Sequence, residues 1–173
     1  GNSWSDAFND FHDALAVAQS RDEIWVAAGT YKPDRGTGDR TLSLKVPCGS
    51  ALYGGLGGWE ECLDDRDWAA NETILSGDVN ANDGPNFTNT GENALHVVEG
   101  GGVSSSAVLN GFTITAGNAE GNWWTRQSWG GGLLIRYGSP TIVNCTFRDN
   151  RASDGGGIAC EVGSPTIANC LFL

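Results

Sequence analysis

The sequence predicts an all-β solenoid, a parallel β-helix with about 25 residues in each regular coil. Two observations predict it. The segment 130–145 returns as 155–170, with Gly-Gly-Gly, Gly-Ser-Pro-Thr-Ile and Asn-Cys in the same places. Within each repeat the larger apolar side chains alternate as in a strand, and Gly, Pro and Asn interrupt every run before a helix could form. Units of this kind bury their apolar faces by stacking on one another.

The N-terminal segment 3–20 predicts an amphipathic helix, with Ser3 or Ser5 able to cap its start. Apolar side chains recur there at spacings of three and four residues: Trp4, Phe8, Phe11, Leu15 and Ala18. An open end of a β-helix exposes apolar columns and unpaired strand edges. We therefore expect this helix to cover the first coil.

Irregular coils follow over 22–118. The first strand is predicted at 24–28 and ends in the turn-forming segment 29–33. Further strands are predicted from short apolar runs at 42–46, 51–54, 73–76 and 95–98.

The regular repeats occupy 130–173, and an older coil precedes them. A shift of 33 positions places Leu109 on Ile142 and Ala119 on Ala152. The predicted interior columns are Leu109/Ile142/Ile167, Phe112/Cys145/Cys170 and Ile114/Phe147/Phe172. Asn144 and Asn169 fall between two strands, where a tight corner favours a residue that tolerates left-handed backbone angles.

Composition narrows the class of protein. A chain of 173 residues with 26 Gly, no Met and a net charge of −11 fits one glycine-rich domain. The acidic charge argues against nucleic-acid binding, and no apolar run is long enough for a membrane span. Five cysteines cannot all pair; Cys48 and Cys62 bracket a glycine-rich stretch and are the candidates for a disulfide.

Several motifs resemble secreted bacterial right-handed β-helix proteins of the pectate-lyase-like superfamily. They are Asp22-Glu-Ile-Trp-Val-Ala-Ala-Gly-Thr-Tyr-Lys-Pro33, Leu52-Tyr-Gly-Gly-Leu-Gly-Gly-Trp-Glu60, Asn71-Glu-Thr-Ile-Leu-Ser-Gly-Asp78 and Leu109-Asn-Gly-Phe-Thr-Ile114. The repeats are also similar to those of chlamydial polymorphic outer-membrane proteins, with Gly156-Gly-Ile158 and Phe147-Arg-Asp-Asn150 as counterparts. The resemblance implies a right-handed solenoid that is secreted or on a cell surface. It does not imply one activity, because such folds host many functions.

An insertion at 119–130 interrupts the repeat. It contains Trp123, Trp124, Arg126 and Trp129, where the next coil has only Ser153-Asp154. A coil needs no such loop, and three indoles with an arginine could stack on sugar rings or bind a protein. The alternative is that the tryptophans pack back against the coil wall.

Oxygen-bearing side chains follow the predicted strand 73–76: Asp78, Asn80, Asn82 and Asp83. Their spacing is typical of calcium loops, although the glycine comes one residue late and Asn89 replaces the closing glutamate of an EF-hand. A plain Asn/Asp turn is the alternative.

A second acidic group spans 60–67. By resemblance to pectate-type lyases, these carboxylates could hold calcium on a uronate, but no arginine stands out as the base. We expect a solvated loop here, with Arg66 paired to its acidic neighbours.

The last residues, Cys170-Leu-Phe-Leu173, form part of a strand with no polar cap after it. We expect either a longer protein, which we favour, or an end that docks on another copy. The function expected is a non-catalytic scaffold for adhesion, glycan binding or self-association. The alternative is part of a calcium-dependent polysaccharide lyase or a glycoside hydrolase.

Overall fold

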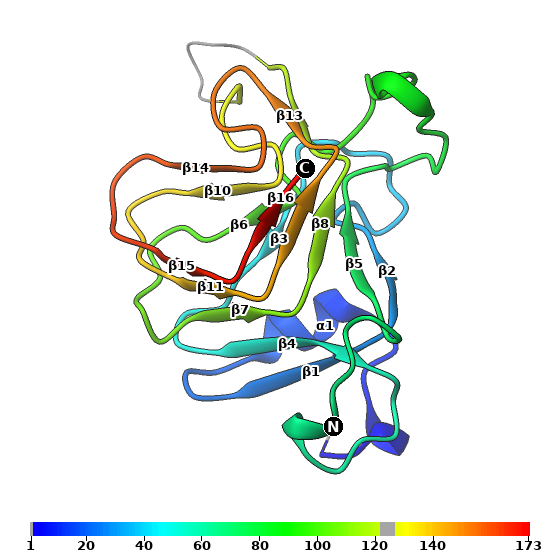
Figure 1. The fold of residues 1–173 in the computed structure, drawn as a ribbon, viewed down its shortest axis with the longest axis vertical. Coiled ribbons are helices and arrows are strands. Elements are labelled where there is room, and N and C mark those ends of the chain that lie inside the picture. Colours follow the sequence, from blue (N-terminus) through cyan, green and yellow to red (C-terminus); the bar gives the residue numbers. More distant parts are fainter. Residues whose placement is uncertain (1, 122–126) are drawn as a thin grey trace.

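The computed structural model describes residues 2–121 and 127–173, and it shows a mostly-β protein built from stacked parallel sheets (Figure 1). The helices are η1 (Trp4–Asp6), α1 (Phe11–Val17), η2 (Leu63–Asp65) and η3 (Pro85–Phe87). The first strands are β1 (Glu23–Ala27), β2 (Gly29–Tyr31), β3 (Leu44–Lys45), β4 (Ala51–Leu56), β5 (Thr73–Ser76), β6 (Val98–Glu99), β7 (Val108–Asn110) and β8 (Thr113–Thr115). The others are β9 (Asn118–Ala119), β10 (Leu133–Ile135), β11 (Thr141–Val143), β12 (Thr146–Arg148), β13 (Arg151–Ala152), β14 (Ile158–Cys160), β15 (Thr166–Ala168) and β16 (Leu171–Phe172).

Strands far apart in the sequence lie side by side, one coil after another. The sheets run β1-β4-β7-β11-β15, β14-β10-β6-β3 and β16-β12-β8-β5-β2, with a small sheet β13-β9. Every pair of these strands is parallel. The prediction of a parallel β-solenoid is confirmed at this level.

The predicted interior columns are present in the register of the strands. Ile142 pairs with Leu109 and with Ile167, and Phe147 pairs with Ile114 and Phe172. The rings of Phe147 and Phe172 stack with centroids 5.1 Å apart. The column members of the earlier coils are almost fully buried in one continuous core. The 33-residue shift inferred from the sequence therefore gives the true coil alignment.

Asparagine occupies the corners between the β11 and β12 sheets, as predicted. Asn144 and Asn169 have φ angles of 54° and 52°. Their side chains also form a ladder: Asn169 donates to Asn144 at 3.4 Å, and Asn144 donates to Asn110 at 3.1 Å. On the preceding coil the corner itself is Gly111, with φ 83°. The ladder thus ties three coils together along one edge.

The N-terminal helix is shorter than the predicted 3–20. Residues 4–6 form a 3₁₀ turn, the chain is extended at Ala7, and α1 starts after Asp10, whose side chain accepts a bond from the N–H of His12 at 2.8 Å. A short polar side chain that bonds the backbone in this way ends one segment and caps the next. Phe11 is buried in the core and meets Tyr31 edge-on at 5.3 Å, so α1 does pack on the first coil.

Two further expectations are corrected. Residues 29–31, predicted to end a strand, form β2, because Gly29 turns the corner and Thr30-Tyr31 pair with β5. The disulfide predicted between Cys48 and Cys62 is not formed, and both thiols are free and exposed. The six-residue strand β4 separates them; at about 3.3 Å per residue it spans roughly 20 Å, and a disulfide needs its Cα atoms within about 7 Å.

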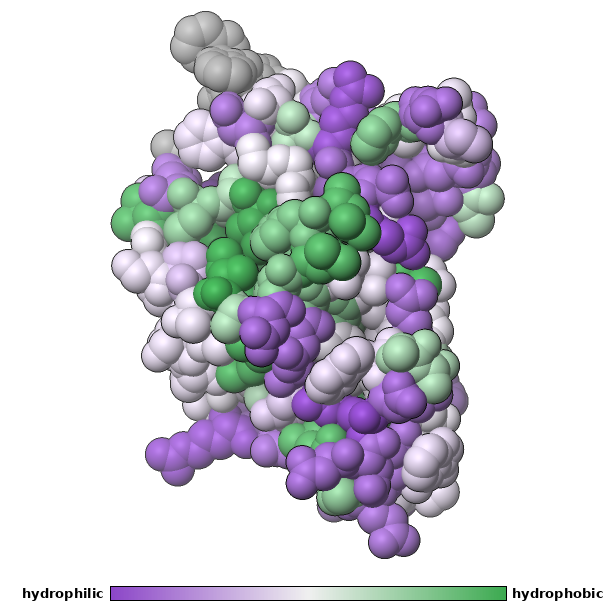
Figure 2. Space-filling view, in the orientation of Figure 1, coloured by the Kyte–Doolittle hydropathy of each residue, from purple (hydrophilic) through white to green (hydrophobic). Residues whose placement is uncertain are grey.

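The last coil exposes apolar side chains. Strands β14, β15 and β16 each have a partner on one side only. Green atoms gather over this coil in Figure 2, and the exposed apolar residues there are Val162, Ile167, Leu171, Phe172 and Leu173. Within the described residues, no helix is both long enough and apolar enough to cross a membrane.

Candidate functional site

One sheet carries a polar column on its outer face. Ser76 of β5 pairs with Thr115 of β8, and Thr115 pairs with Arg148 of β12. Neighbouring side chains along a strand point to opposite faces, and Leu75, Ile114 and Phe147 fill the core side. The hydroxyls and the guanidinium are therefore displayed outward, one coil above the other.

The long loop 77–93 folds back over this column. Ser76 and Thr115 remain buried although they point away from the core. The loop is tied down at both ends, because Ala94 N–H donates to Gly77 O at 2.8 Å and Asn118 Nδ2 donates to Thr90 O at 2.8 Å. A flat sheet face is thereby converted into a walled groove.

The groove has a volume of about 370 Å³. Its floor is the column of Ser76, Thr115 and Arg148, and its walls include Asp149 and the half-exposed ring of Phe87. Asp78, Asp83, Asn86 and Thr90 complete its polar lining. The surface is a mixture of acceptors, donors and one aromatic ring, which is the chemistry that binds sugars.

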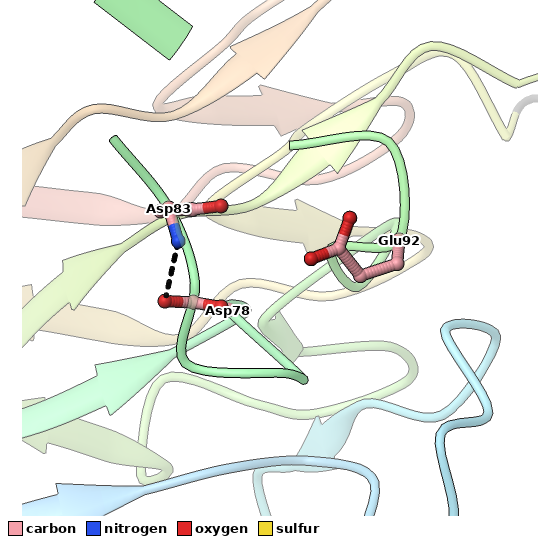
Figure 3. Close-up of side chains that lie close together, drawn as sticks. All are labelled: Asp78, Asp83 and Glu92. Atoms are coloured by element: carbon pink, nitrogen blue, oxygen red, sulfur yellow. Dashed lines mark hydrogen bonds between the residues drawn. The ribbon is translucent and has the colours of Figure 1, made fainter. Parts of the chain in front are cut away.

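Three carboxylates meet beside the groove, and two of them, Asp78 and Asp83, belong to its lining. One oxygen each from Asp78, Asp83 and Glu92 lies within 4.8 Å of the others, and Figure 3 shows the Glu92 carboxylate directed toward the two aspartates. The N–H of Asp83 donates to Asp78 at 3.3 Å. Burial raises the pKa of Asp83, and the charges of Asp78 and Glu92 raise it further, against the opposing effects of Asn93 and Lys32.

The sequence prediction of a calcium loop agrees with this cluster in part. Asp78 and Asp83 are brought together, as the spacing suggested. Asn80 is exposed, and Asn82 contributes backbone atoms: its N–H donates to Asp78 at 3.1 Å and its carbonyl accepts from Asn89 at 3.0 Å. The binding of calcium by the predicted set stays a prediction.

Two residues of the site were missed from sequence. Glu92 lies nine residues after Asp83 and 14 after Asp78, so only the closed loop brings it near them. Arg148 could have been found, because the 33-residue shift that aligns Phe147 with Ile114 also aligns Arg148 with Thr115. The same alignment therefore predicts the residues of the outward polar column as directly as it predicts the residues of the core.

The acidic segment 60–67 is used mainly in holding its own loop. Glu60 is 4% exposed and accepts hydrogen bonds from the N–H groups of Gly57, Gly58 and Trp59. Burial raises the pKa of Glu60, but these N–H groups outweigh it and hold the pKa below its usual value. The expectation of a solvated carboxylate is therefore wrong at this position.

Arg66 also differs from its expected pairing with acidic neighbours. Its guanidinium lies 5.1 Å from the ring centroids of both Tyr53 and Trp68 and donates to Asn110 Oδ1 at 3.3 Å. Arg66 thus makes cation–π contacts with two rings and a hydrogen bond to Asn110 at the end of the asparagine ladder, and these contacts hold the loop against the coils.

The central part of the tryptophan-rich insertion, residues 122–126, lies outside the described residues, and Trp123, Trp124 and Arg126 belong to that part. Trp129 is described; it is partly buried and bridges to Asp154 of the next coil. The role predicted for this insertion stays a prediction.

No family model, no curated protein and no solved structure matches the chain.

Proposed function

We propose that this chain is a right-handed parallel β-helix scaffold, secreted or displayed on a cell surface, that binds a glycan without transforming it. The observation that supports this most directly is the groove on the β5–β8–β12 face. Its floor presents one polar side chain from each of three successive coils, which suits an extended ligand that lies across the coils.

The groove chemistry favours a neutral glycan. Sugar hydroxyls can donate to Asp78, Asp83 and Asp149 and accept from Arg148, and a sugar face can stack on Phe87. A polyuronate would meet three carboxylates in the groove and a net charge of −11 overall, and would be repelled.

The test is retention of the 173-residue chain on immobilised neutral and acidic polysaccharides. Phe87→Ala and Arg148→Ala should each lower retention on a neutral polysaccharide by at least about tenfold, since each removes about 1.4 kcal/mol or more of contact. Phe8→Ala is the matched control, because Phe8 is 48% exposed and Phe87 is 45% exposed. Unchanged retention in both groove variants would contradict the groove as the glycan site.

The predicted tryptophan site is tested in the same assay. If Trp123→Ala and Trp124→Ala abolish retention while the groove variants do not, the insertion binds the glycan and the groove does not.

A polysaccharide lyase is the second candidate, and one observation favours it: two carboxylates of the cluster, Asp78 and Asp83, share one groove with Arg148. The chemistry would require calcium on a uronate and Arg148 as the base that removes the proton next to the carboxylate. Arg148 lies 3.3 Å from Asp149 and 4.0 Å from Glu72, contacts that stabilise the charged guanidinium rather than the base. Unsaturated product from a polyuronate with calcium, lost in Arg148→Lys, would establish the lyase over the scaffold.

A further inference from the structure

The carboxylate cluster supports an inference about the loop itself, and two of its members, Asp78 and Asp83, also line the proposed glycan groove. Asp78 and Glu92 stand near opposite ends of the loop 77–93, and Asp83 lies between them in the sequence. Three carboxylates within 4.8 Å repel one another unless positive charge lies among them. The cluster thus joins the two ends of the loop at a point where the chain alone leaves repulsion.

Buried oxygens beside the cluster provide a second observation. Asn93 is 1% exposed, and its Nδ2 donates to Asp83 Oδ2 at 2.7 Å. Its Oδ1 is buried and accepts no hydrogen bond from the part of the chain that the structure describes, and the same holds for Oε1 of Glu92. Buried oxygens are normally satisfied, so an unsatisfied amide oxygen on Asn93, outside the cluster, and an unsatisfied carboxylate oxygen on Glu92, within it, indicate a missing electropositive partner.

The Asn93 amide can face the cluster either with Nδ2, as a hydrogen-bond donor, or with Oδ1, as a ligand for a cation. Its two ends have nearly the same shape, and a half-turn places Oδ1 beside Asp83 where Nδ2 now lies. Two oxygens at that separation attract one another only through a cation held between them. A cation would therefore satisfy the amide oxygen and relieve the carboxylates together.

We propose that Asp78, Asp83 and Glu92, joined by the amide of Asn93, hold one calcium ion that fastens the 77–93 loop over the β5–β8–β12 face. All four side chains offer oxygen, which is the ligand that calcium takes, and backbone carbonyls and water can fill the remaining positions. Calcium accepts irregular sets of six to eight oxygens, whereas magnesium requires a near-ideal octahedron that a loop closure of this kind does not provide.

The affinity should be moderate. Lys32 Nζ already binds the carbonyl of Val79 at 3.1 Å, and its charge acts on Asp83 in the direction that a bound cation would. The positive charge of Lys32 repels calcium and therefore weakens its binding. We expect a dissociation constant of about 10⁻⁴ to 10⁻³ M, the range of extracellular calcium modules.

The experiment titrates calcium chloride into the EDTA-treated 173-residue chain by calorimetry, with thermal unfolding measured alongside. We expect one ion per chain and a rise in Tm with calcium. Asp83→Asn and Glu92→Gln should weaken binding by about tenfold or more and remove the Tm rise. Asp64→Asn makes the same charge change in an exposed helical turn outside the cluster and should leave the affinity within about twofold.

We expect both variants to fold, because each reduces repulsion among the carboxylates of the ion-free loop. In EDTA, Asp83→Asn should be at least as stable as the parent chain. Absence of binding at about 10 mM calcium would overturn the proposal, since that concentration exceeds the expected range at least tenfold. Equal weakening by Asp64→Asn and Glu92→Gln would overturn it as well, and tighter binding of magnesium would overturn the choice of calcium.

The two proposals can fail separately. Calcium binding is measured without glycan, and glycan retention is measured with Phe87→Ala and Arg148→Ala, which alter no proposed calcium ligand. Retention lost with calcium binding intact leaves the ion site standing, and the reverse result leaves the glycan groove standing.

Discussion

Cys145 and Cys170 show that the pKa of a thiol changes from one coil to the next. They occupy the same place in consecutive repeats, and one is almost fully buried while the other is partly exposed. A hydrogen bond from the Cys145 thiol lowers the pKa of Cys170 to about 6, and the same bond, together with burial, raises the pKa of Cys145 well above its usual value. The repeat thus yields one activated and one inert thiol.

We predict that Cys170 reacts with iodoacetamide faster than Cys145 does. The alkylation rate of Cys170 should level off above about pH 7. The reason is that the thiolate is the nucleophile and is already formed there. Peptide mass spectrometry after timed labelling from pH 5 to 9 measures each site. The unfolded chain in denaturant is the control, and there the rate should keep rising to about pH 8.5, the ordinary value for a thiol. Equal profiles in folded and unfolded chains would contradict the activation.

Corners are the elements that keep the coils in register. Asn144 combines a left-handed backbone with two ladder bonds, one to Asn110 and one from Asn169. Arg66 closes the ladder at Asn110 from the side of the 57–65 loop. The corner therefore depends on both the backbone conformation and the side-chain amide.

We predict that Asn144→Ala lowers the free energy of unfolding by about 2 kcal/mol, roughly half from the left-handed backbone and half from the lost ladder bonds. Asn144→Gly still accepts the left-handed backbone but loses the ladder bonds, so this variant should lower the free energy of unfolding by about 1 kcal/mol. Urea unfolding of both variants separates the two contributions. Identical losses in Ala and Gly would mean that the backbone conformation carries no cost at this corner.

The same corners explain why the coils could be predicted from sequence. A parallel stack repeats its environment at each step, so Leu109 and Ile142 meet equal demands and look alike. Local chemistry also fixes Asn144, because few residues accept its backbone angles.

The site follows no such repetition. Glu92 reaches Asp78 only because a long loop closes, and nothing in the adjacent residues specifies that closure. The N-terminal helix is shorter than the predicted 3–20 for a related reason. Trp4 has helical spacing to Phe8 and Phe11, but its ring lies 6.3 Å from that of Trp25 and its indole N–H donates to the carbonyl of Glu60 at 3.1 Å. Tertiary contacts prevailed over local periodicity.

At the scale of the molecule, the two ends of the stack differ. The first coil is covered, since Trp4 lies against Trp25 and Phe11 against Tyr31. The last coil exposes the edges of β14, β15 and β16 together with a set of apolar side chains (Figure 2). Unpaired parallel edges with apolar faces associate readily.

We predict that the isolated 173-residue chain forms a dimer through its last coil and does not form filaments. A filament needs two complementary ends, and the first coil is closed by residues 4–17, so the remaining arrangement joins two last coils about a twofold axis. Sedimentation at increasing concentration should show a monomer–dimer equilibrium. The double variant Leu171→Lys, Leu173→Lys should shift it to monomer, because two charged edges would face one another. Val17→Lys adds one lysine at an exposed apolar residue of α1, away from the last coil, and should leave the dimer intact. A chain that stays monomeric throughout, or filaments that survive the double variant, would contradict association through this face.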